Sequence, residues 1–168
     1  MPNESLTSAQ VLKVLGENPK RIAEITSRLT PEQLHTTPGR DAWSANDVLA
    51  HLRCCADVWG GGLRTMLEQD RPTIRAVSPR GWVKRTNYPD LRFAQSLGAF
   101  IAQREELLAV LRPLTPQAWA RSATIKASGG ARTWTVLSYA ERLAHHEHHH
   151  LEQFARIVDA IGIARRAR

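Results

Sequence analysis

The sequence of 168 residues contains little cysteine and no long apolar run. Its two cysteines, Cys54 and Cys55, are adjacent, an arrangement poorly suited to a structural disulfide, and we therefore expect a reducing, cytoplasmic environment. No stretch approaches the ~18 apolar residues that a membrane-spanning helix needs, which argues against a membrane protein. Residues 1–5 are polar and slightly acidic, unlike a signal peptide.

Acidic residues are outnumbered by basic ones, which gives a net charge of +7. The segment 71–85 contains no acidic residue but five basic ones, namely Arg71, Arg75, Arg80, Lys84 and Arg85. Basic segments can neutralise the phosphates of nucleic acids. However, no helix here carries a continuous basic face, and no nucleic-acid-binding motif is present. A solvated surface or a site for an anionic small molecule is therefore favoured over nucleic-acid binding.

The sequence shows no convincing strand alternation, whereas apolar residues recur at helical spacing in four stretches. The predicted helices cover about residues 7–29, 44–66, 90–111 and 133–161, the last beginning at Thr133 or Thr135. Pro19 interrupts the first stretch without changing its phase, which predicts one kinked helix. These features predict an all-α fold, a four-helix bundle that forms a single domain over residues 1–168.

Two connections, residues 71–89 and 113–132, are longer than neighbouring antiparallel helices require. A long second connection allows the third helix to run parallel to the second. Long loops are also where helical bundles place substrate contacts. Arg75, Arg80 and Lys84 in the basic segment are therefore candidate substrate-binding residues that could attract carboxylates.

Histidine is concentrated in one place, because five of the seven histidines lie within residues 145–150. Helical phase assigns His146 and His150, one turn apart, to the apolar face of the last helix. The same phase places His145 and His149 on the solvent-exposed face and His148 between the two faces. The pair on the apolar face is therefore the one expected to face the bundle interior.

Two neutral imidazoles one helical turn apart form half of a metal site. His51 lies on the apolar stripe of the second helix and is the candidate third ligand. Three histidines leave coordination positions open for water or substrate, which is typical of a catalytic rather than a structural metal. The alternative is a set of core histidines that form hydrogen bonds with side chains or water.

Three further residues invite both a functional and a structural interpretation. Cys55 lies one helical turn beyond His51. This position is compatible with three roles: a metal ligand, a thiolate nucleophile, or a small buried apolar residue. Arg104 has two candidate roles. It could anchor an anionic group of the substrate, or its aliphatic stem could lie along the core while its charged end reaches water. With Glu147, residues 146–150 match the H-E-x-x-H motif of zinc proteases. Such a match arises readily by chance in a run of histidines, so a metalloprotease is not favoured.

Residues 42–52 resemble the W-S-x-x-[DE]-V-L-x-H-L motif of the DinB superfamily, which includes bacillithiol and mycothiol transferases. Residues 146–153 resemble the H-x-x-H-H-L-x-Q motif of the same superfamily, and residues 29–34 and 130–135 extend the resemblance over nearly the whole chain. The resemblance implies an up-down-down-up bundle, commonly a homodimer. It also implies a divalent metal ion, zinc or nickel, on His51, His146 and His150, the residues that helical phase selects independently.

The resemblance implies a metal-dependent enzyme, either a thiol S-transferase with a low-molecular-weight thiol as cosubstrate or a hydrolase of small molecules. A metal ion lowers the pKa of a bound thiol or water and so makes a nucleophile at neutral pH. The alternatives are a metal-binding or metal-responsive protein without catalysis and, less favoured, a bundle that contacts nucleic acid. Many members carry an acid one turn after the first histidine, where this chain has Cys54 and Cys55, so the general base is not identified.

Overall fold

The computed structural model describes the backbone of residues 5–166 and the side chains of residues 5–162. Most of the N-terminal segment discussed above lies outside the described residues. Four long helices dominate: α1 (Ser8–Thr26), α3 (Ala45–Glu68), α5 (Phe93–Leu111) and α7 (Val136–Arg166). Short helices lie in the connections: α2 (Pro31–Leu34), α4 (Pro79–Val83), α6 (Pro116–Trp119) and the 3-10 turn η1 (Tyr88–Asp90).

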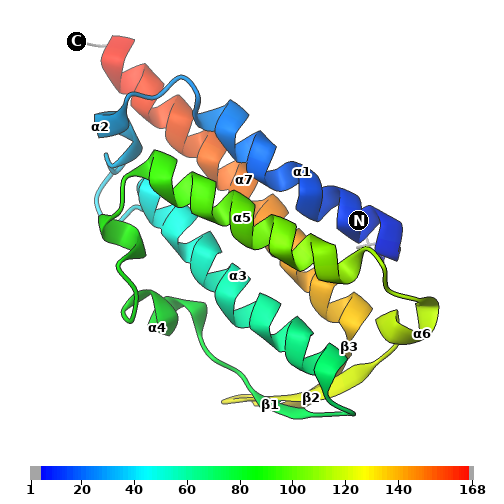
Figure 1. The fold of residues 1–168 in the computed structure, drawn as a ribbon. Helices are drawn as coiled ribbons and strands as arrows, with labels where there is room; N and C mark the ends of the chain where they lie inside the picture. Colours follow the sequence, from blue (N-terminus) through cyan, green and yellow to red (C-terminus); the bar gives the residue numbers. More distant parts are fainter. Residues whose placement is uncertain (1–4, 167–168) are drawn as a thin grey trace.

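The long helices form a four-helix bundle (Figure 1). Helices α3 and α5 run in the same direction and pack against each other, whereas α1 and α7 run the opposite way. This is the expected up-down-down-up order, in which the connection between α3 and α5 passes along the whole bundle. None of the helices in the described part of the chain combines the length and apolar character needed to cross a membrane.

A small sheet at one end of the bundle corrects the all-α prediction (Figure 1). Its strands are β1 (Thr73–Arg75), β2 (Ser122–Ala127) and β3 (Gly130–Thr135). The central strand β2 pairs in parallel with β1 and antiparallel with β3. Strand β2 does alternate, with buried Ala123 and Ile125 between more exposed residues, but a two-residue apolar alternation is too short to stand out in the sequence. Gly130, at a φ of 115°, makes the turn of the β2–β3 hairpin possible.

The helix starts follow from capping residues. Thr7 and Ser44 cap α1 and α3 with complete capping boxes. Helix α1 continues through Pro19 as a single element. Helix α7 begins at Val136, directly after Thr135, whose hydroxyl accepts a hydrogen bond from the backbone N–H of Ser138 at 3.1 Å. Of the two predicted starts, Thr135 is therefore the one that the structure supports, and Thr133 lies in β3. Helix α5 begins at Phe93 because η1 precedes it.

The hydrophobic core is divided into two clusters along the bundle. One cluster contains Cys55 and Ala144, and the other contains Leu52 and Leu151. The division falls at the level of residues 51–55 of α3 and 144–151 of α7. At this level polar side chains cross the bundle interior.

A buried ion pair forms part of this polar layer. Arg104 of α5 and Glu147 of α7 form a salt bridge, and their side chains are 1% and 0% exposed. Asn18 of α1 donates a hydrogen bond of 3.0 Å to the second carboxylate oxygen of Glu147. Arg104 therefore neither extends to water nor reaches a substrate cavity, because its anionic partner is Glu147 inside the bundle.

Removing one member of this pair is expected to destabilise the bundle strongly. Breaking a buried ion pair leaves an uncompensated charge, so Arg104→Ala should lower the free energy of unfolding by about 3–5 kcal/mol. The matched control is Arg112→Ala, which removes an exposed pair with Glu105 and should cost about 1 kcal/mol or less. Urea denaturation followed by circular dichroism measures both, and equal losses in the two variants would contradict the assigned role.

Candidate metal centre

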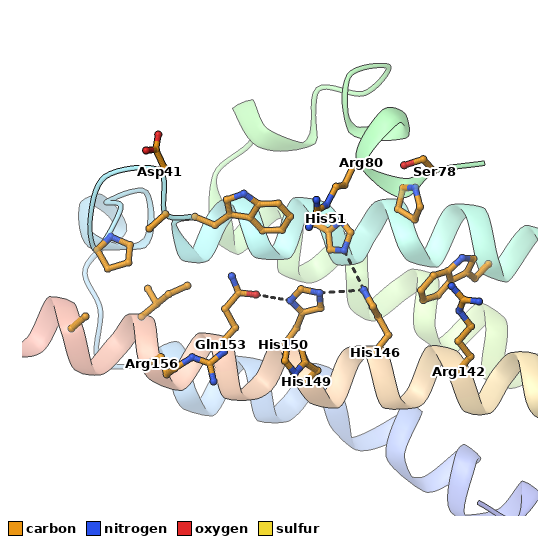
Figure 2. A pocket seen from close by; sticks show the side chains of 17 residues that line it. Asp41, His51, Ser78, Arg80, Arg142, His146, His149, His150, Gln153 and Arg156 are labelled. Carbon is orange, nitrogen blue, oxygen red and sulfur yellow. Dashed lines mark hydrogen bonds between the residues drawn. The ribbon is translucent and has the colours of Figure 1, made fainter. Parts of the chain in front are cut away.

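Three histidine side chains meet between α3 and α7 (Figure 2). His51 comes from α3, and His146 and His150 lie one turn apart on α7. The Nε2 atom of His146 lies 3.3 Å from Nε2 of His51 and 3.2 Å from Nε2 of His150. The structure thus brings together the three residues that helical phase selected.

The three rings cannot satisfy one another by hydrogen bonding. Nδ1 of His150 donates to Oε1 of Gln153 at 2.7 Å, so Nε2 of the neutral His150 ring is an acceptor. Nε2 of His146 then has one proton at most to share between two neighbouring nitrogens. The buried Nδ1 atoms of His51 and His146 have no hydrogen-bond partner in the described part of the chain. A cation among the Nε2 atoms would satisfy all three lone pairs at once.

Burial keeps these rings neutral. Desolvation, followed by the charges of neighbouring histidines, lowers the pKa of His51 to about 4 and that of His146 to about 3. The pKa of His150 is also lowered, again mainly by desolvation. The neutral imidazole is the form that binds metal, so the site is ready for a metal ion at neutral pH.

The spacing of the nitrogens fits a divalent ion. Zinc binds imidazole nitrogen at about 2.0–2.1 Å, so two nitrogens of a tetrahedral zinc site lie about 3.3–3.4 Å apart. The separations of 3.3 and 3.2 Å at His146 are close to this value. Donor chemistry, protonation and the two separations at His146 are therefore compatible with a divalent ion.

Cys55 is a competing donor. Its Sγ atom lies 3.5 Å from Nε2 of His51, and the donor atoms of His51, Cys55 and His146 all lie within 4.8 Å of one another. Burial raises the pKa of the Cys55 thiol, which disfavours the thiolate in the absence of a metal. Cys55 is fully buried and does not line the cavity in front of the histidines. A fourth protein ligand there would close the site, as in structural zinc centres.

Gln153 orients one of the histidines. Its hydrogen bond to Nδ1 of His150 fixes the ring tautomer and directs Nε2 toward His146 (Figure 2). Such contacts behind a metal ligand fix its orientation and raise its basicity. The helical spacing of three residues between His150 and Gln153 was visible in the sequence, although the side-chain contact was not.

The histidines open onto a cavity of about 910 Å³. Trp43 and Trp59 line it near the metal centre, and Arg80, Arg142 and Arg156 contribute positive charge. Figure 2 shows Arg80 on the α4 side and Arg142 on α7. The size and the mixture of apolar and polar walls are typical of a small-molecule site.

The other predicted substrate-binding residues are dispersed. Arg80 lines the cavity of the histidines, whereas Arg75 lines a second, neighbouring cavity. Lys84 is exposed, and Lys84, Arg104 and Cys55 line neither cavity. The basic segment therefore brings one of its three candidate residues to the histidines.

Asp57 positions Arg80, a role that the sequence did not reveal. Its carboxylate accepts hydrogen bonds from Trp82 Nε1 at 3.2 Å and from Tyr88 Oη at 2.9 Å, and it also accepts one from Gln103. These contacts hold the segment that contains α4 against α3 and α5. Since the three partners lie far from Asp57 in the chain, only tertiary packing could identify it.

The remaining residues of the histidine run lie outside the centre. His145 is half-buried beside Glu141 at 3.6 Å, His148 is exposed rather than half-buried, and the side chain of His149 is 69% exposed at the rim of the cavity. Glu147 faces Arg104 and Asn18, away from the cavity. It is therefore not placed as the general base that the H-E-x-x-H letters would require.

Comparisons with known proteins identify relatives of this fold. A sequence profile of the DinB superfamily matches residues 15–154. Among solved structures, YfiT from Bacillus subtilis, described as a probable metal-dependent hydrolase with an unusual four-helix bundle topology, superposes with a TM-score of 0.81. It shares 22% sequence identity, and the match covers 96% of this chain and 93% of that chain. No curated protein matches the sequence.

Single substitutions test the ligand set. We expect His51→Ala, His146→Ala and His150→Ala each to abolish tight binding of one divalent ion per chain, because each removes a converging Nε2 atom. His145→Ala and His149→Ala should leave binding nearly intact. Elemental analysis after dialysis measures the metal content.

Cys55→Ser separates the two candidate ligand sets in the same assay. Retention of the metal in Cys55→Ser supports the three-histidine site. Loss of the metal in Cys55→Ser, together with its retention in His150→Ala, would instead assign the site to His51, Cys55 and His146.

Gln153→Leu tests the orientation of His150. Without the acceptor at Nδ1, the ring is free to rotate and change tautomer, and metal affinity should fall by about 10–100-fold. Competition with a chromophoric chelator measures the affinity. Gln153→Glu keeps an acceptor and should retain most of the affinity, and an unchanged affinity in Gln153→Leu would show that the contact is incidental.

Proposed function

The chain belongs to the DinB superfamily, and from this premise we propose that it is a metal-dependent enzyme that hydrolyses a small-molecule substrate. One observation carries the proposal: three neutral histidines line one open cavity, with Nε2 of His146 at 3.3 Å from that of His51 and at 3.2 Å from that of His150. A structural metal site is closed by four protein ligands, whereas a three-ligand site facing a cavity leaves room for substrate.

His51, His146 and His150 would hold the ion, with zinc or nickel the candidate metals. When bound, a divalent ion supplies Lewis acidity and lowers the pKa of a bound water or thiol. Gln153 orients His150, and the rings of Trp43 and Trp59 pack beside those of His51 and His146.

Hydrolysis is preferred because the structural neighbour YfiT is described as a probable metal-dependent hydrolase. Positive charge in the cavity supports a substrate with an anionic group. Asp41 is the one acidic residue among those that line the cavity, and three arginines line it as well. A peptidase of the H-E-x-x-H type is not supported, since Glu147 is paired with Arg104 in the core.

A thiol S-transferase is the second candidate. The supporting observation is Arg80, whose side chain lines the cavity beside the histidines and could attract a carboxylate of a low-molecular-weight thiol. The same metal centre suits both reactions, because water and thiol are ionised by the same positive charge. The two candidates differ in the nucleophile and share the ligand set.

The metal-loaded protein is expected to hydrolyse members of an ester and amide panel, or to consume a thiol in the presence of an electrophile. Chelation or His51→Ala should lower the rate by at least about 100-fold, because a metal centre contributes several kcal/mol of transition-state stabilisation. His148→Ala, on the exposed face of α7, is the control and should keep the rate.

Product formation is followed by absorbance in the ester, amide and thiol assays. A rate that survives both chelation and loss of His51 would overturn the proposal. A metal-loaded protein that is inactive in all three assays would favour the non-catalytic metal-binding alternative.

A further inference from the structure

A second cavity of about 980 Å³ adjoins that of the histidines. It lies between the sheet and the helices α3 and α7, and Trp59, Ser78, Pro79 and Arg142 line both cavities. The two cavities are therefore neighbours that share part of their lining, and the second lies close to the histidines.

Arg142 lies at the junction of the cavities. It precedes His146 by four residues, so both side chains lie on the same face of α7. Its guanidinium carbon lies 5.2 Å from the ring centre of Trp59 and 5.3 Å from that of Trp134. The ring of Trp59 in turn lies 4.8 Å from that of His146. Two indoles thus hold the arginine beside the metal centre.

Arg142 carries a charge that the described part of the chain leaves without a carboxylate partner. It takes part in none of the ion pairs within these residues. A guanidinium group presents several N–H donors in a planar arrangement that suits a carboxylate. Arg142 is exposed and therefore accessible to a ligand in the cavity.

Strand register adds a second arginine on the same side. Arg132 pairs with Ile125, which is 8% exposed, so both lie on the face of the sheet that covers the bundle. Arg75 pairs with Lys126 at the next position of the strand, so their side chains alternate to the other face. Register thus places Arg132 on the bundle side of the sheet, where Arg142 of α7 also lies. Arg75 and Lys126, on the opposite face, still belong to the lining of the second cavity.

Apolar and aromatic side chains form one part of the second cavity, while Arg75, Lys126 and Arg132 add positive charge to its walls. Trp59, Trp134, Tyr139 and Ile125 line it, and no acidic residue is among its described walls. Tyr139 packs closely on Gly62, where a Cβ atom would come within 3.0 Å of the ring. A ligand that fits these walls has an apolar or aromatic body and one anionic group.

We propose that the second cavity binds the carboxylate-bearing, apolar end of the substrate through Arg142, with Arg132 supporting it. The orientation of the reactive group toward the histidines rests on the proposed function, whereas the binding itself does not. The substrate class is therefore a small apolar or aromatic carboxylate that carries a second, hydrolysable group.

The test uses a matched pair of probes on the full chain stripped of metal. 4-Phenylbutyrate has the expected carboxylate and apolar body, and 4-phenylbutyramide has the same shape without charge. Isothermal titration measures both dissociation constants. Because a charge-assisted hydrogen bond contributes about 1.5–3 kcal/mol, the carboxylate should bind about 10–100-fold more tightly than the amide.

Substitutions locate the source of this preference. Arg142→Gln should reduce it to about twofold or less, while Arg142→Lys should retain part of it because the charge remains. The control is Arg64→Gln, which removes a charge from α3 outside both cavities and should retain the full preference. Thermal unfolding of each variant verifies that the fold is intact.

Two results would overturn the inference: equal binding of acid and amide by the unaltered protein, or a full preference in folded Arg142→Gln. Both results come from binding measurements in the absence of metal and of any reaction, so they are independent of the proposed function. Conversely, a protein that binds 4-phenylbutyrate through Arg142 but shows no metal-dependent reaction would retain this site and lose the proposed function.

Discussion

The buried contact between Glu147 and Arg104 is the constraint on which the site depends. Neither charge can be left unpaired inside the bundle, so Glu147 must face Arg104 of α5 and Asn18 of α1. This requirement sets the rotation of α7 about its axis. With Glu147 directed to one side, His146 and His150 are directed to the other, toward His51 of α3. The buried pair thereby directs His146 and His150 toward His51.

The connections between helices turn this centre into a site. The segment that contains α4 is held by Asp57 and brings Arg80 to the cavity, while the sheet closes the neighbouring cavity against α3 and α7. The long connections thus form walls of both cavities. Positive charge on these walls and neutral histidines at the base suit an anionic small molecule near a divalent ion.

The histidines of α7 show most clearly what helical periodicity can predict. Periodicity alone separated His146 and His150 from His145 and His149, because an amphipathic helix has one apolar face and residues four apart share it. Helical periodicity did not predict that Glu147 lies in the core. A charged residue is buried only when it has a partner, and periodicity carries no information about a partner on another helix. It also failed at β1 and β2, whose pairing joins residues some 50 positions apart, such as Thr73 and Thr124.

The sequence by itself determined the four long helices and the apolar faces on which His51, His146 and His150 lie, because helical periodicity depends on residues within a few positions of one another. Only the tertiary structure decided the partner of Arg104, the anchoring of α4 by Asp57, the sheet, and the place of Arg142 between Trp59 and Trp134. Apart from the β2–β3 hairpin, most of these contacts join residues that are distant in sequence. Local periodicity carries no information about which distant surfaces meet, so packing alone could establish them.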